Sequence, residues 1–523
     1  MSERLAKSAG LIGIATLASR VLGLVRDVVQ GHYFGTGPAA DAFAVATRIP
    51  TLLRDLFAEG AMSAAFVPTV TRYLSTDGKA AAFRLGSQVV NGLLLITGVI
   101  VTIGIVFAEP LVSWFAGDYA AEPGKLELTV LLTRVNMPFL LLVAVAAAYM
   151  GMLNALRRFF IPANSPTMFN VAFIVCTVAF FPIFTQMGIH PVMALSVGML
   201  VGGVVQILVM WPALHREGYR HEWVLNPRDP GLREVLILMG PGTLGVAAAQ
   251  INLLVNTQLA THEAGAASAL QYAFRMMYMP IGIFSVSIAT AAIPELARHA
   301  AKAELPEMRS TLSWGLRLML MLSVPATVGL MVLSRPIIEL IYERGMFDAQ
   351  STLQVAGALM FYAPGIVGYS IVKIVSPSFY SLRDARTPVI VSLVTIAANL
   401  ALNIWLNSIM GFRGLALGTA IAANINAGLL LYLLSRRIGG VDARRVGITL
   451  LKVAVASAVM GVAVYYADTA LHRLLPEPSL TPRLLRVAGG IGAGLGTLAL
   501  ASWMLRIEEL QQATNRLLKR LRP

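Results

Sequence analysis

The sequence predicts an all-α polytopic membrane protein, on the basis of its composition, its long apolar segments and an internal repeat. Of the 523 residues, 57% are hydrophobic and 13% are charged, and the mean hydropathy is +0.71. Soluble domains carry about 25% charged residues, so this chain is too apolar for one. Apolar segments long enough to cross a bilayer as helices recur along the whole chain, and we expect about 14 of them.

The expected transmembrane helices follow one another from the N-terminus, and the first two carry an unusual number of charges. We expect the helices at residues 9–35, 41–71, 86–108, 126–151, 163–184, 192–212, 234–256, 267–296, 311–333, 353–376, 388–406, 414–435, 447–467 and 485–505. The polar link HREGYRHEWVLNPRDPGLRE separates the sixth helix from the seventh, and the basic segment NRLLKRLRP follows the last.

Basic residues predict the orientation of the chain in the membrane. An even number of spans places both termini on one side, and the loops on that side contain clusters around Arg157, Arg228, Arg298 and Arg436. Loops rich in Lys and Arg stay in the cytoplasm. We therefore expect both termini to lie in the cytoplasm. The net charge of +14 then reflects these loops and the anionic membrane lipids rather than nucleic-acid binding.

An internal repeat with a constant offset of 226 residues, the distance from Pro68 to Pro294, predicts two related lobes. Identical residues recur at this offset, namely Pro68 and Pro294, Arg72 and Arg298, Pro110 and Pro336, Pro138 and Pro364, Leu156 and Leu382, Arg157 and Arg383, and Pro162 and Pro388. Each copy has six expected spans, an even number, so both copies insert with the same topology. Such parallel repeats place the substrate site between the two halves.

The repeat also predicts the division of the chain. We expect an N-lobe of six helices at residues 1–225 and a C-lobe of six helices at 226–440. Residues 441–523 then hold the thirteenth and fourteenth helices and a basic cytoplasmic tail.

Charged residues within the first two helices are the candidate functional groups. They are Arg20, Arg26, Asp27, Asp41, Arg48, Arg54, Asp55 and Glu59. Each ion at membrane depth costs roughly 2.5–3.5 kcal/mol on insertion scales, so such residues face a protein interior or a watery cavity. One interpretation is purely structural, with Arg–Asp pairs that hold helices in register.

Helix geometry suggests how these charges pair. Residues seven apart lie on nearly the same helix face, which brings together Arg20 with Asp27, Asp41 with Arg48, and Arg48 with Asp55, although Pro50 is expected to bend the last pair apart. Arg26 and Arg54 have no acid at that spacing within their own helix. We therefore regard these two arginines as the first candidates for contact with an anionic substrate.

The sequence lacks the common signatures of catalysis. The histidines form no metal-ligand pattern, and the chain contains neither a Walker A motif nor a GxSxG motif. Cys176 is the single cysteine, which excludes a disulfide framework. The acidic pair Asp55 and Glu59 is the nearest to an acid–base site, and charge balancing by the neighbouring arginines is the preferred interpretation. We expect a transporter without cofactor or metal, not an enzyme.

Four segments carry a specific resemblance. SRVLGLVRD, DAFAVATRIPTLLRDLFAEGAMSAAFVP, YAFRMMYMPIGIFSVSIAT and KIVSPSFYSLRDARTPV resemble the MurJ/MviN family of lipid II flippases in the MOP exporter superfamily. The resemblance covers essentially the whole chain. It implies movement of undecaprenyl-diphosphate-linked disaccharide pentapeptide, the peptidoglycan precursor, from the inner to the outer leaflet by alternating access. It also implies a central cavity between two lobes and a hydrophobic groove towards the last two helices.

The resemblance assigns roles to individual residues. The essential cavity arginines of the family correspond to Arg20, Arg26, Arg54 and Arg275, which are the expected substrate-binding residues. Its essential acid corresponds to Asp41, and Asp27, Arg48, Asp55 and Glu59 are expected to tune or gate the charge of the cavity. Asp55 and Phe274 differ from the residues of some members.

The resemblance also bears on ions and partners. Some members of the family are thought to bind sodium, for which Asp384 is a candidate ligand here, although Asn256 stands where an acid would be expected. The expected partners are lipid II, membrane lipids and proteins of cell-wall synthesis, and the chain is expected to act as a monomer.

Two alternatives remain open at this stage. One is a related MOP-type exporter of drugs or of other polyprenyl-linked oligosaccharides, for which an acid would be essential and the arginines dispensable. The other is a membrane scaffold, which would keep its activity after the charges of the first two helices were neutralised.

Overall fold

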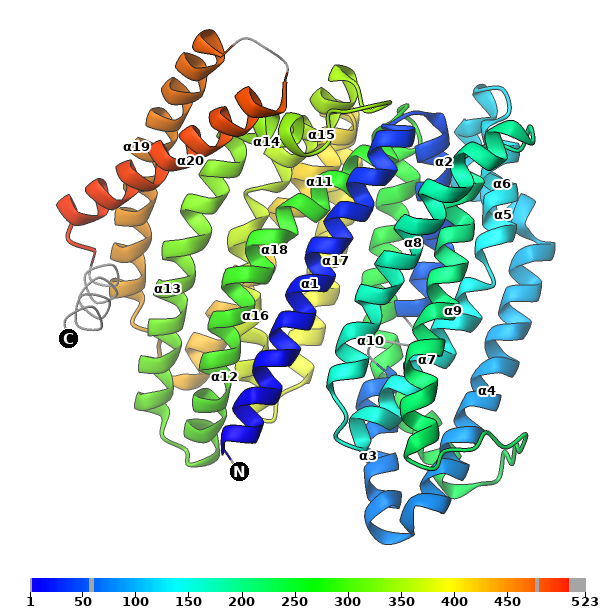
Figure 1. Cartoon of the computed structure of the whole chain (residues 1–523). Coiled ribbons are helices and arrows are strands. Elements are labelled where there is room, and N and C mark those ends of the chain that lie inside the picture. The colour runs from blue at the N-terminus through cyan, green and yellow to red at the C-terminus, as the bar shows by residue number, and fades with distance from the viewer. Residues whose placement is uncertain (1, 56–60, 476–478, 508–523) are drawn as a thin grey trace. The chain divides into compact units, whose positions relative to one another are not determined.

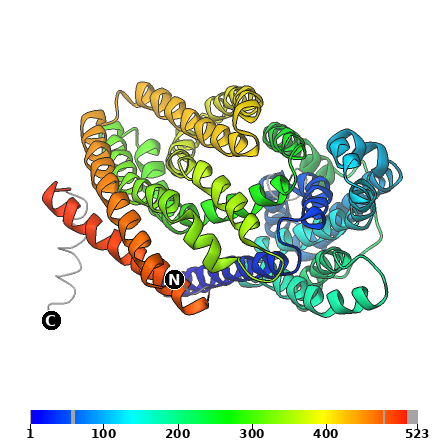
Figure 2. The same ribbon diagram turned by 90° about the horizontal axis from the view of Figure 1, so that it is seen from above.

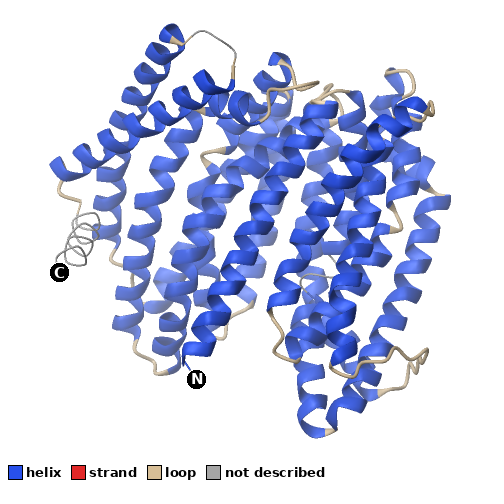
Figure 3. Ribbon diagram, in the orientation of Figure 1, coloured by secondary structure: helices blue, strands red, loops and turns tan. Residues whose placement is uncertain are grey.

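The structure, a computed structural model, describes residues 2–55, 61–475 and 479–507, and within these residues it contains helices and no strand (Figure 3). The chain divides into two compact units (Figure 1). The first unit comprises Met1–Ser268 and Arg344–Phe347, and the second comprises Ala269–Glu343 and Asp348–Pro523. This division falls later than the boundary expected at residue 225, and that boundary stays a prediction.

The helices of the first unit are α1 (Ser2–Phe34), α2 (Pro38–Arg54), α3 (Ala61–Thr76), α4 (Gly78–Val106), α5 (Ala108–Ala116), η2 (Gly117–Ala121), α6 (Lys125–Asn136), α7 (Phe139–Ala155), α8 (Phe160–Gln186), α9 (Met193–Arg216) and α10 (Pro230–Ala260). The next helix, α11 (Ala266–Pro280), begins in this unit and continues into the second. The second unit contains η3 (Ile281–Ser285), α12 (Val286–Ala301), α13 (Leu305–Val332), α14 (Ser334–Ile341), α15 (Ala349–Tyr362), α16 (Gly365–Ser381), α17 (Arg386–Met410), α18 (Phe412–Ile438), α19 (Ala443–Leu474) and α20 (Leu480–Met504).

Helix length and hydropathy confirm a polytopic membrane protein. Ten helical segments among the described residues are long and apolar enough to span a membrane, or eleven if α15 and α16, bent by 48° at their junction, form one broken span. The expected number of 14 is not confirmed. The expected spans that are absent from this set are those of α1, of α2 with α3, and of α10, and α1 and α2 contain the charged residues singled out above.

The predicted repeat is visible in the backbone of both units. The starts of α5 and α14, of α7 and α16, and of α8 and α17 are separated by the same offset as the repeated residues. Pro138 precedes α7 as Pro364 precedes α16. The repeated pair Arg157 and Arg383 adopts φ of 59° and 57°, a left-handed conformation that is uncommon for any residue other than glycine. The two copies therefore share their turns as well as their sequence pattern.

Packing explains why α10 belongs to the first unit. Leu232 and Val235 of α10 lie in a buried apolar cluster with Phe66 of α3, Leu85 of α4 and Met152 of α7. Close van der Waals packing of these side chains holds α10 against α3, α4 and α7.

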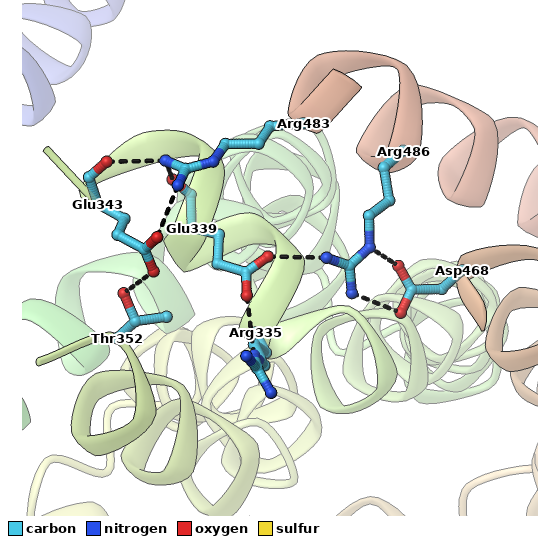
Figure 4. Close-up of polar contacts among 7 residues, drawn as sticks. All are labelled: Arg335, Glu339, Glu343, Thr352, Asp468, Arg483 and Arg486. Carbon is cyan, nitrogen blue, oxygen red and sulfur yellow. Dashed lines mark hydrogen bonds and ion pairs between the residues drawn. The ribbon is translucent and has the colours of Figure 1, made fainter. Parts of the chain in front are cut away.

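The last two helices pack on α13 and α14 within the second unit (Figure 2). A polar network joins their ends (Figure 4). Arg486 of α20 donates to Glu339 of α14 at 2.8 Å and to Asp468 of α19 at 2.5 Å. Arg483 of α20 pairs with Glu343 at 2.6 Å. Arg486 on α20 therefore links α14 to α19 through hydrogen bonds to both helices.

Candidate functional site

A cavity within the first unit brings together the two arginines that helix spacing singled out. It has a volume of about 290 Å³, and both Arg26 of α1 and Arg54 of α2 line it. Its remaining walls come from α7, α8 and α9, with Phe169 and Asn170 on α8 and Gln206 on α9. Two guanidinium groups and two amides thus face a cavity whose other walls are mostly apolar.

Aromatic rings and an adjacent acid hold the Arg26 side chain. Its guanidinium carbon lies 5.5 Å from the ring centre of Phe173 and 6.0 Å from that of Phe169. The neighbouring Asp27, which is 3% exposed, accepts hydrogen bonds from Arg26 Nε at 3.3 Å and Nη2 at 3.2 Å. Cation–π contacts contribute about 0.5–1 kcal/mol at exposed sites and more when desolvated. The rings and the carboxylate therefore fix the position of this cation.

Arg54 has a similar arrangement at the end of α2. Its Nε and Nη2 donate to Asp55 Oδ1 at 2.9 and 2.7 Å, and Gln250 of α10 donates to the other Asp55 oxygen at 3.3 Å. The Arg54 side chain remains 32% exposed. Each cavity arginine thus pairs with the acid that follows it in sequence.

Asp41, the expected gating residue, is fully buried and binds three different segments of the first unit. Its Oδ2 lies 3.3 Å from Lys125 Nζ of α6 and accepts from the Gly265 amide at 2.7 Å. Its Oδ1 accepts from the amide and the hydroxyl of Ser268 at 3.0 and 2.8 Å. The Asp41 carboxylate therefore caps the N-terminus of α11, where the helix dipole favours a negative charge.

The predicted pairing of Asp41 with Arg48 is wrong. Residues seven apart share a helix face but lie about 10 Å apart along the helix axis, too far for direct contact unless long side chains bridge the gap. Lys125 reaches Asp41 from a neighbouring helix instead. Arg48 Nε donates to Thr257 Oγ1 of α10 at 3.1 Å. The expected Arg20–Asp27 and Arg48–Asp55 pairings give way in the same manner to the neighbouring arginines Arg26 and Arg54.

The remaining residues that the sequence singled out are Arg20, Arg275 and Glu59. Arg20 is exposed on α1 and does not line the cavity described above. Arg275 is half-buried on the part of α11 that belongs to the second unit. Glu59 lies outside the described residues.

Asp384, the candidate sodium ligand, occupies a loop of the second unit. It accepts from the Arg386 and Thr387 amides at 3.1 and 3.0 Å and from the Thr387 hydroxyl at 2.7 Å, and it pairs with Arg437. The hydrogen bonds from Thr387 hold the pKa of Asp384 below its usual range. Hydrogen bonds from the amides of Arg386 and Thr387 are typical of a carboxylate that caps the start of a helix, here α17. Within the described residues no group of three or more His, Cys, Asp and Glu side chains is placed to hold a metal ion.

Sequence reasoning did not identify Lys125, Ser268, Phe169 and Phe173. Lys125 lies just before the helix expected from residue 126, and no spacing within one helix links it to Asp41. The two phenylalanines lie in an ordinary apolar helix pattern, so only the packing of α8 on α1 shows that they contact Arg26.

Comparisons with known proteins identify the family. The family model described as lipid II flippase MurJ matches residues 31–483. The chain is 33% identical to a probable lipid II flippase MurJ of Vibrio cholerae, over 98% of this chain and 99% of that protein. It is 34% identical to the lipid II flippase MurJ of Burkholderia cenocepacia, over 81% of this chain and 82% of that protein.

Solved structures of other proteins share the fold of this chain. A structure of lipid II flippase MurJ in an inward closed conformation is 27% identical, with a TM-score of 0.78 over 95% of this chain and all of that one. An inward-facing multidrug resistance MATE transporter of the MOP superfamily is 15% identical, with a TM-score of 0.64 over 82% of this chain and 98% of that one, which shows a common fold. The chain therefore belongs to the lipid II flippase MurJ family.

Proposed function

We propose that this chain moves lipid II, the undecaprenyl-diphosphate-linked peptidoglycan precursor, from the inner to the outer leaflet of the bacterial cytoplasmic membrane. Membership of the MurJ family supports this function. The structural observation that carries it is the cavity of the first unit, where Arg26 and Arg54 face the same space. The protein acts as a monomer, with both termini in the cytoplasm.

The chemistry of the headgroup explains why arginines line the cavity. A diphosphate carries several negative charges, and the planar guanidinium group can donate two parallel hydrogen bonds to a phosphate. Asp27 and Asp55 pair with Arg26 and Arg54 at 3.2 and 2.7 Å. The diphosphate replaces these carboxylates as the partner of the arginines. Arg20 and Arg275 are the further arginines that contact the headgroup during its passage.

Asp41 is the gating residue in this mechanism. It ties α2 and α6 to the first turn of α11, the helix that carries Arg275. Alternating access requires that such a contact breaks and reforms in each cycle. Release of Ser268 and Gly265 from Asp41 frees the start of α11, so the gate and a substrate-binding arginine lie on one helix.

Arg48, Asp55 and Glu59 tune the charge of this region. Arg48 donates to Thr257, and Gln250 donates to Asp55, so both charged groups bind α10. The membrane potential adds a driving force for outward movement of net negative charge, about 2.3 kcal/mol per charge per 100 mV.

Transport of labelled lipid II in liposomes tests the proposal. We expect Arg26→Ala, Arg54→Ala and Arg275→Ala to reduce both lipid II binding and leaflet transfer at least tenfold, because a charge-assisted hydrogen bond contributes about 1.5–3 kcal/mol. Arg473→Ala, which removes an exposed arginine at the end of α19, is the matched control and should transfer lipid II normally. Each variant is compared at equal abundance of monodisperse protein. Wild-type binding and transfer by all three cavity variants would refute the proposed mechanism.

The same liposomes distinguish the alternative exporter. A drug exporter of the same superfamily would transport drugs whether or not the cavity arginines are present, and would require an acid instead. We expect lipid II to be transported, and an imposed inside-negative potential to increase its rate.

A further inference from the structure

A second basic pocket lies in the other unit and has no place in the mechanism above. Its volume is about 410 Å³, and it lies between the first half of α13 and the loop that joins α18 to α19. Three arginines line it, namely Arg309, Arg317 and Arg445, together with Ser310 and Ser313. Asp442 is the acid in its wall, so the lining carries a net charge of about +2 at neutral pH.

The donors on α13 form a stripe along one face of the helix. Arg309, Ser313 and Arg317 follow one another at intervals of four residues, which places them in line on successive turns. After Arg317 the helix is mostly apolar as far as Val332. Arg317 lies about 18 Å along the helix from Leu305, well inside a helix that is long enough to span a membrane. An ionised residue at such a depth is expected to serve a function, because its insertion is costly.

The loop opposite α13 fits around the Arg309 side chain. Arg309 Nε donates to the Ile438 carbonyl at 2.5 Å, which fixes the guanidinium at the pocket wall. Gly439 adopts φ of +77°, and a Cβ at this position would clash with Arg309 Nη2. The left-handed conformation favours glycine, and a larger residue would require the Arg309 guanidinium to move. In the same loop, Asp442 caps the start of α19, and its Oδ2 lies 3.3 Å from Arg445 Nε.

We propose that this pocket binds the phosphate group of an anionic membrane phospholipid. Three guanidinium groups and two hydroxyls are the donors that a phosphate requires. The volume is in the range of small-molecule sites, and basic pockets between transmembrane helices are known sites for phospholipid headgroups. The depth of Arg317 favours a ligand that reaches the pocket from the membrane. A soluble phosphate has the same donor requirements, so the experiment separates the two sources.

Native mass spectrometry of the full-length protein measures the binding. Purified protein is titrated with phosphatidylglycerol, with phosphatidylcholine as the zwitterionic control, and in parallel with glycerol phosphate. We expect preferential binding of phosphatidylglycerol, and about tenfold weaker binding by Arg317→Gln, since one charge-assisted hydrogen-bond donor is lost. Ser310→Glu should weaken binding similarly by placing a negative charge at the pocket, and because Ser310 is exposed this variant tests the site even if Arg317→Gln does not fold.

Arg436→Gln is the matched control. It removes an exposed positive charge from the same end of α18 without changing the pocket lining. Wild-type binding by this control supports the pocket, and displacement of the lipid by glycerol phosphate confirms that the phosphate is the recognised group. Tight binding of glycerol phosphate with no preference for phosphatidylglycerol would assign the pocket to a soluble phosphate and overturn the lipid assignment. Equal binding by wild type, Arg317→Gln and Ser310→Glu, or an equal loss in Arg436→Gln, would overturn the site itself. None of these outcomes depends on lipid II transfer, so the lipid II proposal is tested separately.

Discussion

The carboxylate of Asp41 and the ammonium group of Lys125 lie 3.3 Å apart, and their side chains are 0% and 3% exposed. Removing one partner of a buried ion pair typically costs about 3–5 kcal/mol, because the other charge stays buried. We expect Lys125→Met to lower the thermal stability of the purified protein, and the double variant Asp41→Asn/Lys125→Met to recover part of the loss. Lys302→Met, which removes a lysine that is 56% exposed, should change the stability little. If Lys125→Met unfolds at the wild-type temperature, the pair does not stabilise the gate.

Arg26 should tolerate lysine only partly. Lysine keeps the positive charge of Arg26 but loses the planar fork, and it stacks less well on the rings of Phe169 and Phe173. We therefore expect lipid II affinity to fall in the order wild type, Arg26→Lys, Arg26→Ala. Binding titrations with purified variants give this order, and equal affinities for arginine and lysine would show that charge alone is recognised.

The network in Figure 4 predicts that Arg486 stabilises the packing of the last two helices. Arg486 is 12% exposed and binds both Glu339 and Asp468, whereas Arg335 is 58% exposed and binds Glu339 alone. Hydrogen bonds to charged groups contribute about 1.5–3 kcal/mol when they are protected from water. We expect Arg486→Gln to lower the unfolding temperature clearly and Arg335→Gln to lower it little. Equal effects in thermal unfolding would contradict a specific role of Arg486.

The ion pairs of Glu217 predict a dependence of stability on pH. Hydrogen bonds from Lys79 and then from Arg158 lower the pKa of Glu217 below its ordinary value of 4.5. Because the pKa is lower in the folded protein, the stabilisation is complete above the unfolded pKa and is lost as the pH falls through the folded pKa. Both cations are more than half exposed, so we expect only about 1 kcal/mol. Glu217→Gln should therefore unfold at a lower temperature than wild type at pH 7, and the difference should shrink as the pH falls below 4.5.

Accessible single cysteines test the predicted orientation of the chain. The buried Cys176 is first replaced by alanine. We expect an impermeant thiol reagent to label Asp118→Cys from outside intact cells and to label Arg228→Cys only after lysis. Both positions are exposed, whereas the adjacent Tyr119 is only 2% exposed and would react poorly. Labelling of Arg228→Cys in intact cells would reverse the topology.

Local patterns in the amino-acid sequence were sufficient to predict the fold class and much of the candidate site. Hydropathy predicted a helical membrane protein, because a helix in lipid must satisfy its own backbone hydrogen bonds. The internal repeat matched Arg157 with Arg383, and the structure shows that both adopt the same left-handed conformation. Arg26 and Arg54 stood out because charges at membrane depth are costly, and both line one cavity.

The partners of these charges depend on the packing between helices, which spacing along one helix does not contain. Asp41 binds Lys125 and Ser268 from other segments, and Arg26 stacks on phenylalanines of α8. The basic pocket combines donors that are distant in the sequence, on α13 and on the segment that begins α19. A buried charge is stabilised by whichever donors and acceptors the folded chain brings within about 3 Å, and that proximity arises only when the helices pack.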